Sequence, residues 1–482
     1  MQLAVIQRIL GILLSLFSLT MFPPLVISLV TSDGIAIPFL SAFALILSIG
    51  LILWVPVRNI KNELRLRDGF VVVVLFWAGL GLSGSVPLIL LETPDLSITD
   101  AMFESISGLT TTGATILTGI DFLPKSILFY RQELQWLGGM GIIVLAVAIL
   151  PMLGIGGMQL YRAETPGPVK DTKLTPRITE TAKALWYIYL TMTILCALAY
   201  WFAGMTIFDA IAHSFSTVSI GGFSTHDASM GYFHSGWIEA VAICFMFLSG
   251  INFSLHFMSW RFTSLKPYWH DAEFKAYLSI LVLICLICAT YHVIIGDYET
   301  FGAALEDSIF QSVSIATTTG FTTAEYQGWH GFMPLLLLFS SFIGACAGST
   351  GGGIKVIRIL LLFKQGMREI KRLIHPNALF IIKLDKPIPE RIIEAVWGFF
   401  ATYIAVFALL LLALMATQLD QVTAFSALAA CMNNLGPGLG KVSQHYGNIN
   451  DVAKWILCFA MLLGRLEIFT LLVLFTPTFW RR

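Results

Sequence analysis

DAMFESISGLTTTGAT (100–115), DAIAHSFSTVSIGGFS (209–224), DSIFQSVSIATTTGFT (307–322) and TAFSALAACMNNLGPG (423–438) are the stretches that decide the fold. The opening residue of each lies 13 positions before a glycine, and these glycines are Gly113, Gly222, Gly320 and Gly436. Each stretch reads as a short helix followed by a run rich in hydroxyl residues and glycine, which cannot easily continue that helix. One such run alone could be an ordinary polar turn. Four runs in phase indicate four copies of one structural unit.

Each copy lies between apolar segments close to the roughly 20 residues that a helix needs to cross a bilayer. We predict spans near 6–30, 36–56, 70–91, 127–152, 184–203, 236–259, 276–295, 331–363, 392–416 and 453–476. The expected fold class is an all-α polytopic membrane protein with about ten transmembrane helices, in which four helix/pore-loop/helix repeats surround one pore after an extra N-terminal helix pair. The predicted segments are 1–68 (N-terminal transmembrane pair), 69–183 (pore repeat 1), 184–275 (pore repeat 2), 276–389 (pore repeat 3 with an intramembrane gate loop) and 390–482 (pore repeat 4).

The composition agrees with a membrane protein, and the distribution of Lys and Arg along the chain predicts its orientation. Of the 482 residues, 57% are hydrophobic and 12% are charged, and the formal net charge is zero, so nothing indicates binding to nucleic acid. With these spans, 24 of the 29 Lys and Arg residues fall on one side of the membrane. The positive-inside rule predicts that this side is cytoplasmic and that both termini lie there.

The residue types at the ends of the four half-helices suit a monovalent cation. Such an ion must exchange its water shell for several oxygens, and short segments of Thr, Ser, Asn and Gly can supply backbone carbonyls, because glycine permits unusual backbone angles. The C-terminal ends of the half-helices also favour a cation in a central cavity. We expect Asp100, Asp209 and Asp307 to cap these half-helices rather than to bind the ion. The fourth copy begins with Thr423 instead, so we expect it to be the least regular.

Beyond the pore loops, GACAGSTGGGIKVIRILLLFKQG (344–366), NNLGPGLG (433–440) and GRLEIFTLLVLFTPTFW (464–480) resemble the Trk/Ktr/HKT superfamily of cation transporters over essentially the full length. The resemblance implies a potassium ion as the cargo and a selectivity filter lined by Thr111, Thr112, Gly113, Ile220, Gly221, Gly222, Thr318, Thr319, Gly320, Asn434, Leu435 and Gly436. Glycine rather than serine at position 113 favours potassium over sodium within that superfamily.

The same resemblance implies the partners and the location. We expect a homodimer in the bacterial inner membrane, surrounded by lipid, with a cytosolic nucleotide-binding gating ring (TrkA-like) beneath it. No nucleotide fold is present in this chain, so nucleotide binding is expected of that partner only. The segment from Lys355 to Arg391 carries nine basic residues, which give the topological signal and could also dock an acidic partner.

A gate is predicted below the filter. Five of the ten residues between Gly344 and Gly353 are glycine, and each costs up to about 1 kcal/mol in a helix relative to Ala, so the span at 331–363 should break. Arg465 lies within the last predicted span and needs polar partners, since an arginine facing lipid costs roughly 2.5 to 3.5 kcal/mol. The carbonyls and hydroxyls of the glycine-rich loop are the expected acceptors, and Glu467 is a poorer partner. The predicted gate consists of Gly348, Ser349, Thr350, Gly351, Gly352, Gly353 and Arg465.

A coupled symporter and a membrane enzyme are the two alternative functions. A symporter coupled to protons or sodium remains open, although broken-helix transporters typically carry inverted repeats and all four loops here enter from one side. A membrane enzyme is disfavoured, because GACAGSTGGGIK lacks the GK[ST] ending of a phosphate loop and Ser349 has no expected His or carboxylate partner at its depth.

Overall fold

The computed structural model describes residues 1–60, 65–141, 178–384 and 387–481, and within these ranges the chain forms helices and loops without a β-strand. The N-terminal pair consists of α1 (Leu3–Ser18), α2 (Phe22–Thr31) and α3 (Ala36–Trp54). Helices α1 and α3 approach closely at Gly11 and Gly50, where an added β-carbon would lie under 3.0 Å from the opposite helix. Small residues at such a contact allow close packing where lipid provides no hydrophobic drive.

Each repeat contains an outer helix, a short pore helix and an inner helix. Repeat 1 has α4 (Leu66–Ile89), α5 (Ile98–Leu109) and α6 (Lys125–Trp136), which continues as a π-helical turn at Leu137–Gly141. Repeat 2 has α9 (Ile178–Phe202), α10 (Ile207–Val218), α11 (Gly236–Ser249), α12 (Phe253–Phe262) and the short α13 (Lys266–His270). Repeat 3 has α14 (Ala272–Ile295), α15 (Phe301–Ala316), α16 (Met333–Ile343) and α17 (Val356–Ile374). Repeat 4 has α18 (Glu390–Ala416), α19 (Gln421–Met432), α20 (Asp451–Arg465), α21 (Phe469–Leu472) and α22 (Pro477–Trp480).

The inner helices differ from the predicted straight spans. In the described residues six helices are long and apolar enough to cross a membrane, or up to eight if two bent pairs count as single spans. The predicted span 236–259 bends by 94° between α11 and α12, and the span 453–476 bends by 108° after Arg465. The predicted break within 331–363 is confirmed by the loop between α16 and α17. The end of the span predicted at 127–152 lies outside the described residues.

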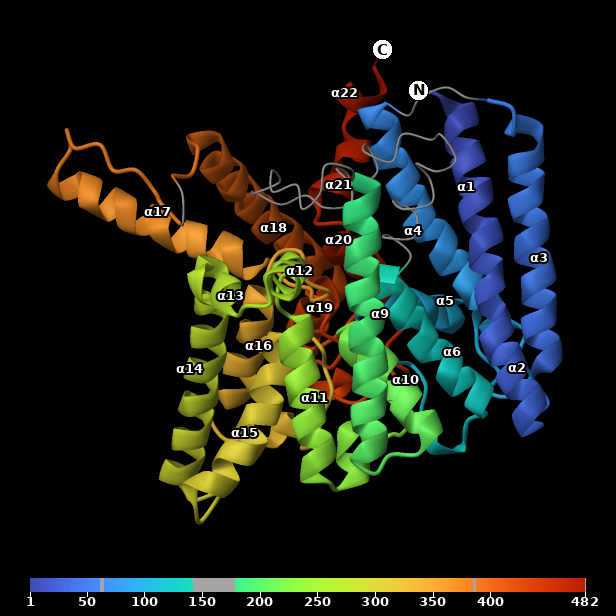
Figure 1. Ribbon diagram of the computed structural model, residues 1–482, viewed down its shortest axis with the longest axis horizontal. Helices are drawn as coiled ribbons and strands as arrows, with labels where there is room; N and C mark the ends of the chain where they lie inside the picture. The colour runs from blue at the N-terminus through green and yellow to red at the C-terminus, as the bar shows by residue number, and fades with distance from the viewer. Residues whose placement is uncertain (61–64, 142–177, 385–386, 482) are drawn as a thin grey trace.

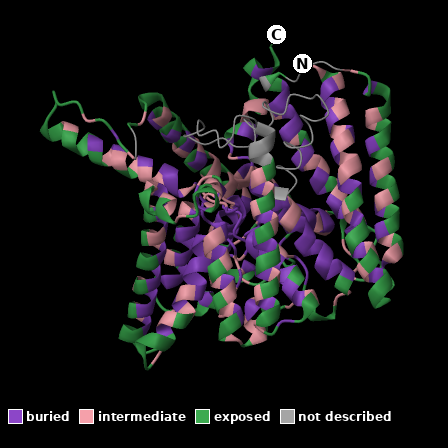
Figure 2. Ribbon diagram, in the orientation of Figure 1, coloured by how far each residue is buried: buried purple, intermediate pink, exposed green. Residues whose placement is uncertain are grey.

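Burial follows the repeat architecture (Figure 2). Buried residues gather around the pore helices at the centre, whereas the outer helices present apolar side chains outward, as in α18, where Leu409 is 68% exposed. Exposed apolar surface on a long helix is expected where lipid is the solvent. Both termini lie at the same end of the molecule, and α17 extends sideways away from the bundle (Figure 1).

Candidate functional site: a ring of four pore loops

The four pore helices end in one shared backbone conformation. In each repeat a non-glycine residue with a φ between 55° and 68° is followed, two positions later, by a glycine with a φ between 78° and 99°. The residue between them donates its backbone N–H to the carbonyl five positions earlier, at 2.8 or 2.9 Å. These residues are Thr111, Thr112 and Gly113; Ile220, Gly221 and Gly222; Thr318, Thr319 and Gly320; and Asn434, Leu435 and Gly436. The fourth repeat keeps the pattern, with the largest φ at Gly436.

The loops meet in a closed ring. A β-carbon added to Gly113 would lie under 3.0 Å from the carbonyl oxygen of Gly221, and the same holds from each repeat to the next. The pairs that follow are Gly222 with Thr319, Gly320 with Leu435, and Gly436 with Thr112. Real β-carbons do not approach so closely, so only glycine fits at the four positions. The structure therefore brings together all twelve residues predicted for the filter.

Side chains brace this ring in the same way in repeats 1 and 3 and in other ways in repeats 2 and 4. The hydroxyls of Thr110 and Thr112 hydrogen bond at 2.7 Å, and those of Thr317 and Thr319 at 2.8 Å. In repeat 4 the Tyr446 hydroxyl donates to the carbonyl of Gly436 at 2.7 Å. The brace for repeat 2 comes from outside that repeat, from α6.

A loop of repeat 3 lies directly against the ring. Thr350 Oγ1 donates to the Val218 carbonyl in repeat 2 at 3.0 Å, and the Gly352 N–H donates to Thr318 Oγ1 in repeat 3 at 2.7 Å. The Gly353 N–H donates to the Asn433 carbonyl in repeat 4 at 3.1 Å. The glycine-rich loop thus contacts three of the four pore loops directly.

Arg465 connects this loop to the remaining repeat. Its guanidinium donates to the Thr350 carbonyl at 3.4 Å and to Thr111 Oγ1, in repeat 1, at 3.3 Å. The predicted contact with the glycine-rich loop is present. The sequence interpretation missed the other acceptors, which are the carbonyls of Gly138 and Gly139 in the π-helical turn after α6. Arg465 ends α20 instead of lying inside a straight span, and Glu467 forms an ion pair with Arg358.

The predicted helix caps are wrong by three or more residues. Hydroxyls three positions earlier cap the first two pore helices, since Ser97 accepts from the Asp100 N–H and Thr206 from the Asp209 N–H, both at 3.1 Å. Thr300 caps α15, which places Asp307 inside that helix, and Asp420 caps α19. A carboxylate in the first turn still favours the helix, because it faces the positive end of the dipole.

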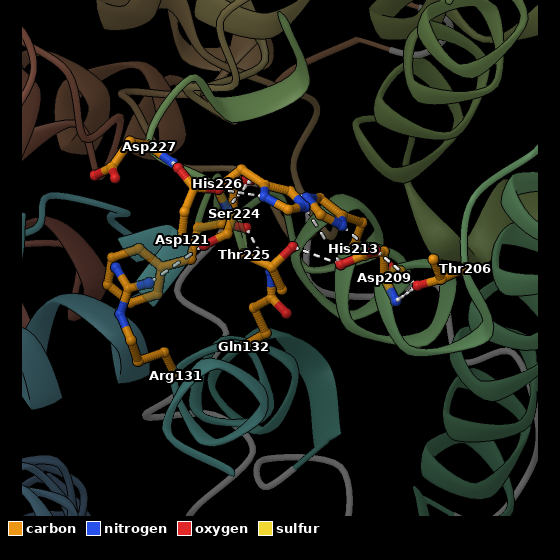
Figure 3. A network of polar contacts seen from close by, with 11 residues as sticks. Asp121, Arg131, Gln132, Thr206, Asp209, His213, Ser224, Thr225, His226 and Asp227 are labelled. Atoms are coloured by element: carbon orange, nitrogen blue, oxygen red, sulfur yellow. Dashed lines mark hydrogen bonds and ion pairs between the residues drawn. The ribbon is translucent and has the colours of Figure 1, made fainter. Parts of the chain in front are cut away.

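Behind the ring lies a buried polar cluster that sequence reasoning missed. Arg131 of α6 forms an ion pair with Glu104 of α5 at 2.7 Å, and the two side chains are 1% and 0% exposed. Arg131 also donates to Thr115 Oγ1 at 3.0 Å. Figure 3 shows Arg131 and Gln132 reaching from α6 toward the loop that follows the ring in repeat 2. The polar run RQELQ (131–135) inside a predicted span was the available signal, because buried polar groups need partners.

An all-helical membrane protein in which four pore loops close a ring belongs to the class of pore-loop transport proteins. The family model for TrkH, described as a cation transport protein, matches residues 37–482. This chain belongs to the TrkH family of cation transport proteins.

Individual relatives agree along the whole chain. The Trk system potassium uptake protein TrkH of Vibrio parahaemolyticus is 59% identical over 488 residues, covering 100% of both chains. The Trk system potassium uptake protein TrkG of Escherichia coli is 41% identical over 478 residues, covering 99% of this chain and 98% of TrkG. The crystal structure of the potassium transporter TrkH from Vibrio parahaemolyticus matches with a TM-score of 0.91 and 56% identity, with both chains fully covered. Because these relatives are transport proteins, they confirm the interpretation that this chain is not an enzyme.

Proposed function

We propose that this chain is the potassium-conducting subunit of an uptake system in the bacterial inner membrane. The observation that carries the proposal is the closed ring, in which four equivalent loops place backbone carbonyls around one axis. Rings of carbonyls replace the hydration shell of potassium in selective pores. The names of the relatives, which are potassium uptake proteins and a potassium transporter, support the same cargo.

The loop from Gly344 to Lys355 acts as the gate in this proposal. It contacts pore loops on the side where the half-helices end, and it continues directly into α17, which extends away from the bundle (Figure 1). A cytosolic nucleotide-binding subunit that moves α17 would therefore pull on the loop. The basic residues of α17, including Lys371 and Arg372 in its last turn, suit an acidic surface on that subunit.

The chain works as a homodimer in this proposal, each copy with its own pore, and both termini are cytoplasmic. Both termini lie at one end of the molecule, which supports their placement on the same side of the membrane (Figure 1).

Isotope flux in proteoliposomes tests the function. Potassium and rubidium should enter faster than sodium and lithium, and the regulatory subunit should change the rate. Equal rates for all four ions would reject a potassium filter. Uptake that requires a proton or sodium gradient would instead indicate the coupled symporter.

A further inference from the structure

One face of α6 holds the backbone of the repeat 2 pore loop. The Gln135 side chain donates from Nε2 to the Gly221 carbonyl at 2.6 Å, and its Oε1 accepts from the Phe223 N–H at 3.1 Å. Gln132 Nε2 donates to the Phe223 carbonyl at 3.1 Å, and Arg131 donates to the Ser224 carbonyl at 3.3 Å. Of the three, Gln135 alone bonds a carbonyl of the ring itself.

Repeat 2 depends on such an outside contact because of its own sequence. Repeats 1 and 3 brace the residue before the ring glycine through a pair of threonine hydroxyls. Repeat 2 has Gly221 at that position, directly before Gly222, so no side chain there can form a similar brace. Two consecutive glycines also allow the peptide between them to rotate more freely than any other pair. Gln135 is fully buried and fits closely, since a β-carbon on Gly221 would lie under 3.0 Å from its amide group.

We propose that Gln135 is a positioning residue for ion selectivity, which fixes the orientation of the Gly221 carbonyl through its side-chain amide. This inference rests on the proposed potassium filter. The Gly221 carbonyl is also the one that lies against Gly113, so it sets the spacing between pore loops 1 and 2. Selectivity depends on the position and the field strength of the ring carbonyls. An N–H bonded to a carbonyl fixes the position of its oxygen and modifies its field strength.

The test compares potassium and sodium flux through purified full-length protein in proteoliposomes. Gln135→Met keeps the volume of the side chain but removes the amide. We expect the potassium-to-sodium flux ratio to fall about fivefold, the effect of one net hydrogen bond on an equilibrium. The matched control is Gln311→Met, because Gln311 is equally buried in pore helix α15 but bonds Thr323 and Ala324, which lie beyond the ring. That control should keep the ratio.

A second variant keeps the test decisive if Gln135→Met does not fold. An ionised Gln135→Glu side chain can accept from the Phe223 N–H but cannot donate to the Gly221 carbonyl, whereas a protonated one can do both. Its flux ratio should therefore rise as the pH is lowered from about 9 to about 6, relative to the unmutated protein at each pH. Unmutated selectivity in Gln135→Met, or a Gln135→Glu ratio equal to the unmutated one at every pH, overturns this inference. Absence of any potassium preference in the unmutated protein would instead overturn the proposed function.

Discussion

A β-carbon on Gly113 would lie under 3.0 Å from the carbonyl oxygen of Gly221. The contact joins pore loops whose sequences are more than 100 residues apart, and it recurs between every pair of neighbouring loops around the ring. The glycines are thus required twice, once for their positive φ and once for the approach of the next carbonyl.

Replacing Gly113 by Ser should lower the ratio of potassium to sodium flux, because the new side chain must displace the Gly221 carbonyl. The control is Gly119→Ser, in the same repeat. Gly119 also has a positive φ, 66°, but its added β-carbon would meet only Phe122 at 3.9 Å. Both variants bear the backbone strain of roughly 1 to 2 kcal/mol, and only the first disturbs the ring. An unchanged ratio in Gly113→Ser would contradict the assignment of this glycine to the filter.

The capping hydroxyls give a prediction about stability. Thr206→Ala should lower the free energy of unfolding by about 1 kcal/mol, because the Asp209 N–H loses its acceptor, whereas Thr206→Ser should be nearly neutral. Thermal unfolding in detergent measures the difference.

Asp100→Asn should leave selectivity unchanged, since Asp100 pairs with Lys454 outside the ring. A large loss of selectivity in Asp100→Asn would show that its charge acts on the ion.

The sequence predicted the parts of the fold that follow from local pattern. The repeats, the four glycines and the break after Ile343 were readable, because each depends on residue types at fixed spacing. The caps were misplaced, although Ser97 and Thr206 each stand three residues before an Asp, a pattern typical of a helix start. The contact of Arg465 with the glycine-rich loop was predicted, because an intramembrane arginine needs polar acceptors. The contacts of Gln135, and those of Arg465 with Gly138 and Gly139, were not predictable, because these partners lie more than 80 residues away and depend on how the repeats pack.

Glu273 links the gate loop to the first turn of α17. Its Oε1 accepts from the Ala347 N–H at 2.7 Å and from the Ile357 N–H at 3.0 Å. Glu273→Ala leaves the N–H groups of Ala347 and Ile357 without this acceptor, at roughly 1 to 3 kcal/mol for a buried group, and should loosen the loop. Potassium flux without the regulatory subunit should rise. Glu273→Gln keeps an acceptor oxygen, so its flux should rise less. Equal flux in the unmutated protein, Glu273→Ala and Glu273→Gln would argue against a role for Glu273 in holding the loop.

An ion pair whose strength depends on pH joins the loops that follow the ring in repeats 1 and 2 (Figure 3). His226 bonds Asp121 at 2.5 Å, lies 3.6 Å from Asp209 and stacks on Tyr232. Burial lowers the pKa of His226, but the carboxylates of Asp209 and Asp121 outweigh it, and the pKa is raised above 6.5. Because the pKa is raised in the folded state, protonated His226 contributes to the stability of the fold. This contribution is fully present below about pH 6.5 and is lost as the pH rises through the folded-state pKa.

Thermal unfolding at several pH values tests the contribution of this ion pair. The unmutated protein should exceed His226→Gln in midpoint temperature near pH 6, and the difference should shrink toward pH 9. His234→Gln, at an exposed position on the same loop, is the control for the loss of a histidine from this loop. A constant difference between the unmutated protein and His226→Gln at all pH values would mean that packing on Tyr232, rather than charge, accounts for the contribution of His226.

Arg465 holds the gate loop to the ring, and its removal should open the pore. The side chain contacts Thr350 in the loop, Thr111 in the ring and Gly139 at the end of repeat 1, so it places a fixed positive charge between the loop and the ring. In the proposed function, a charge in that position opposes cations electrostatically while the loop obstructs them sterically. We therefore expect Arg465→Ala, or deletion of Gly351 to Gly353, to raise potassium flux in the absence of the regulatory subunit.

Arg465→Lys separates the two contributions of this residue. A lysine keeps the positive charge but cannot donate to Thr350, Thr111 and Gly139 together, since it lacks the planar fork of the guanidinium. If the contacts restrain the loop, flux through Arg465→Lys should approach that of Arg465→Ala; if charge dominates, it should stay near the unmutated value. Folded yield and thermal midpoint test whether Arg465 is purely structural. In that case Arg465→Ala lowers both without raising flux per folded molecule. If Arg465→Ala and the glycine deletion fold normally while flux stays at or below the unmutated level, the gate lies elsewhere, because neither the charge nor the loop then limits the passage of potassium.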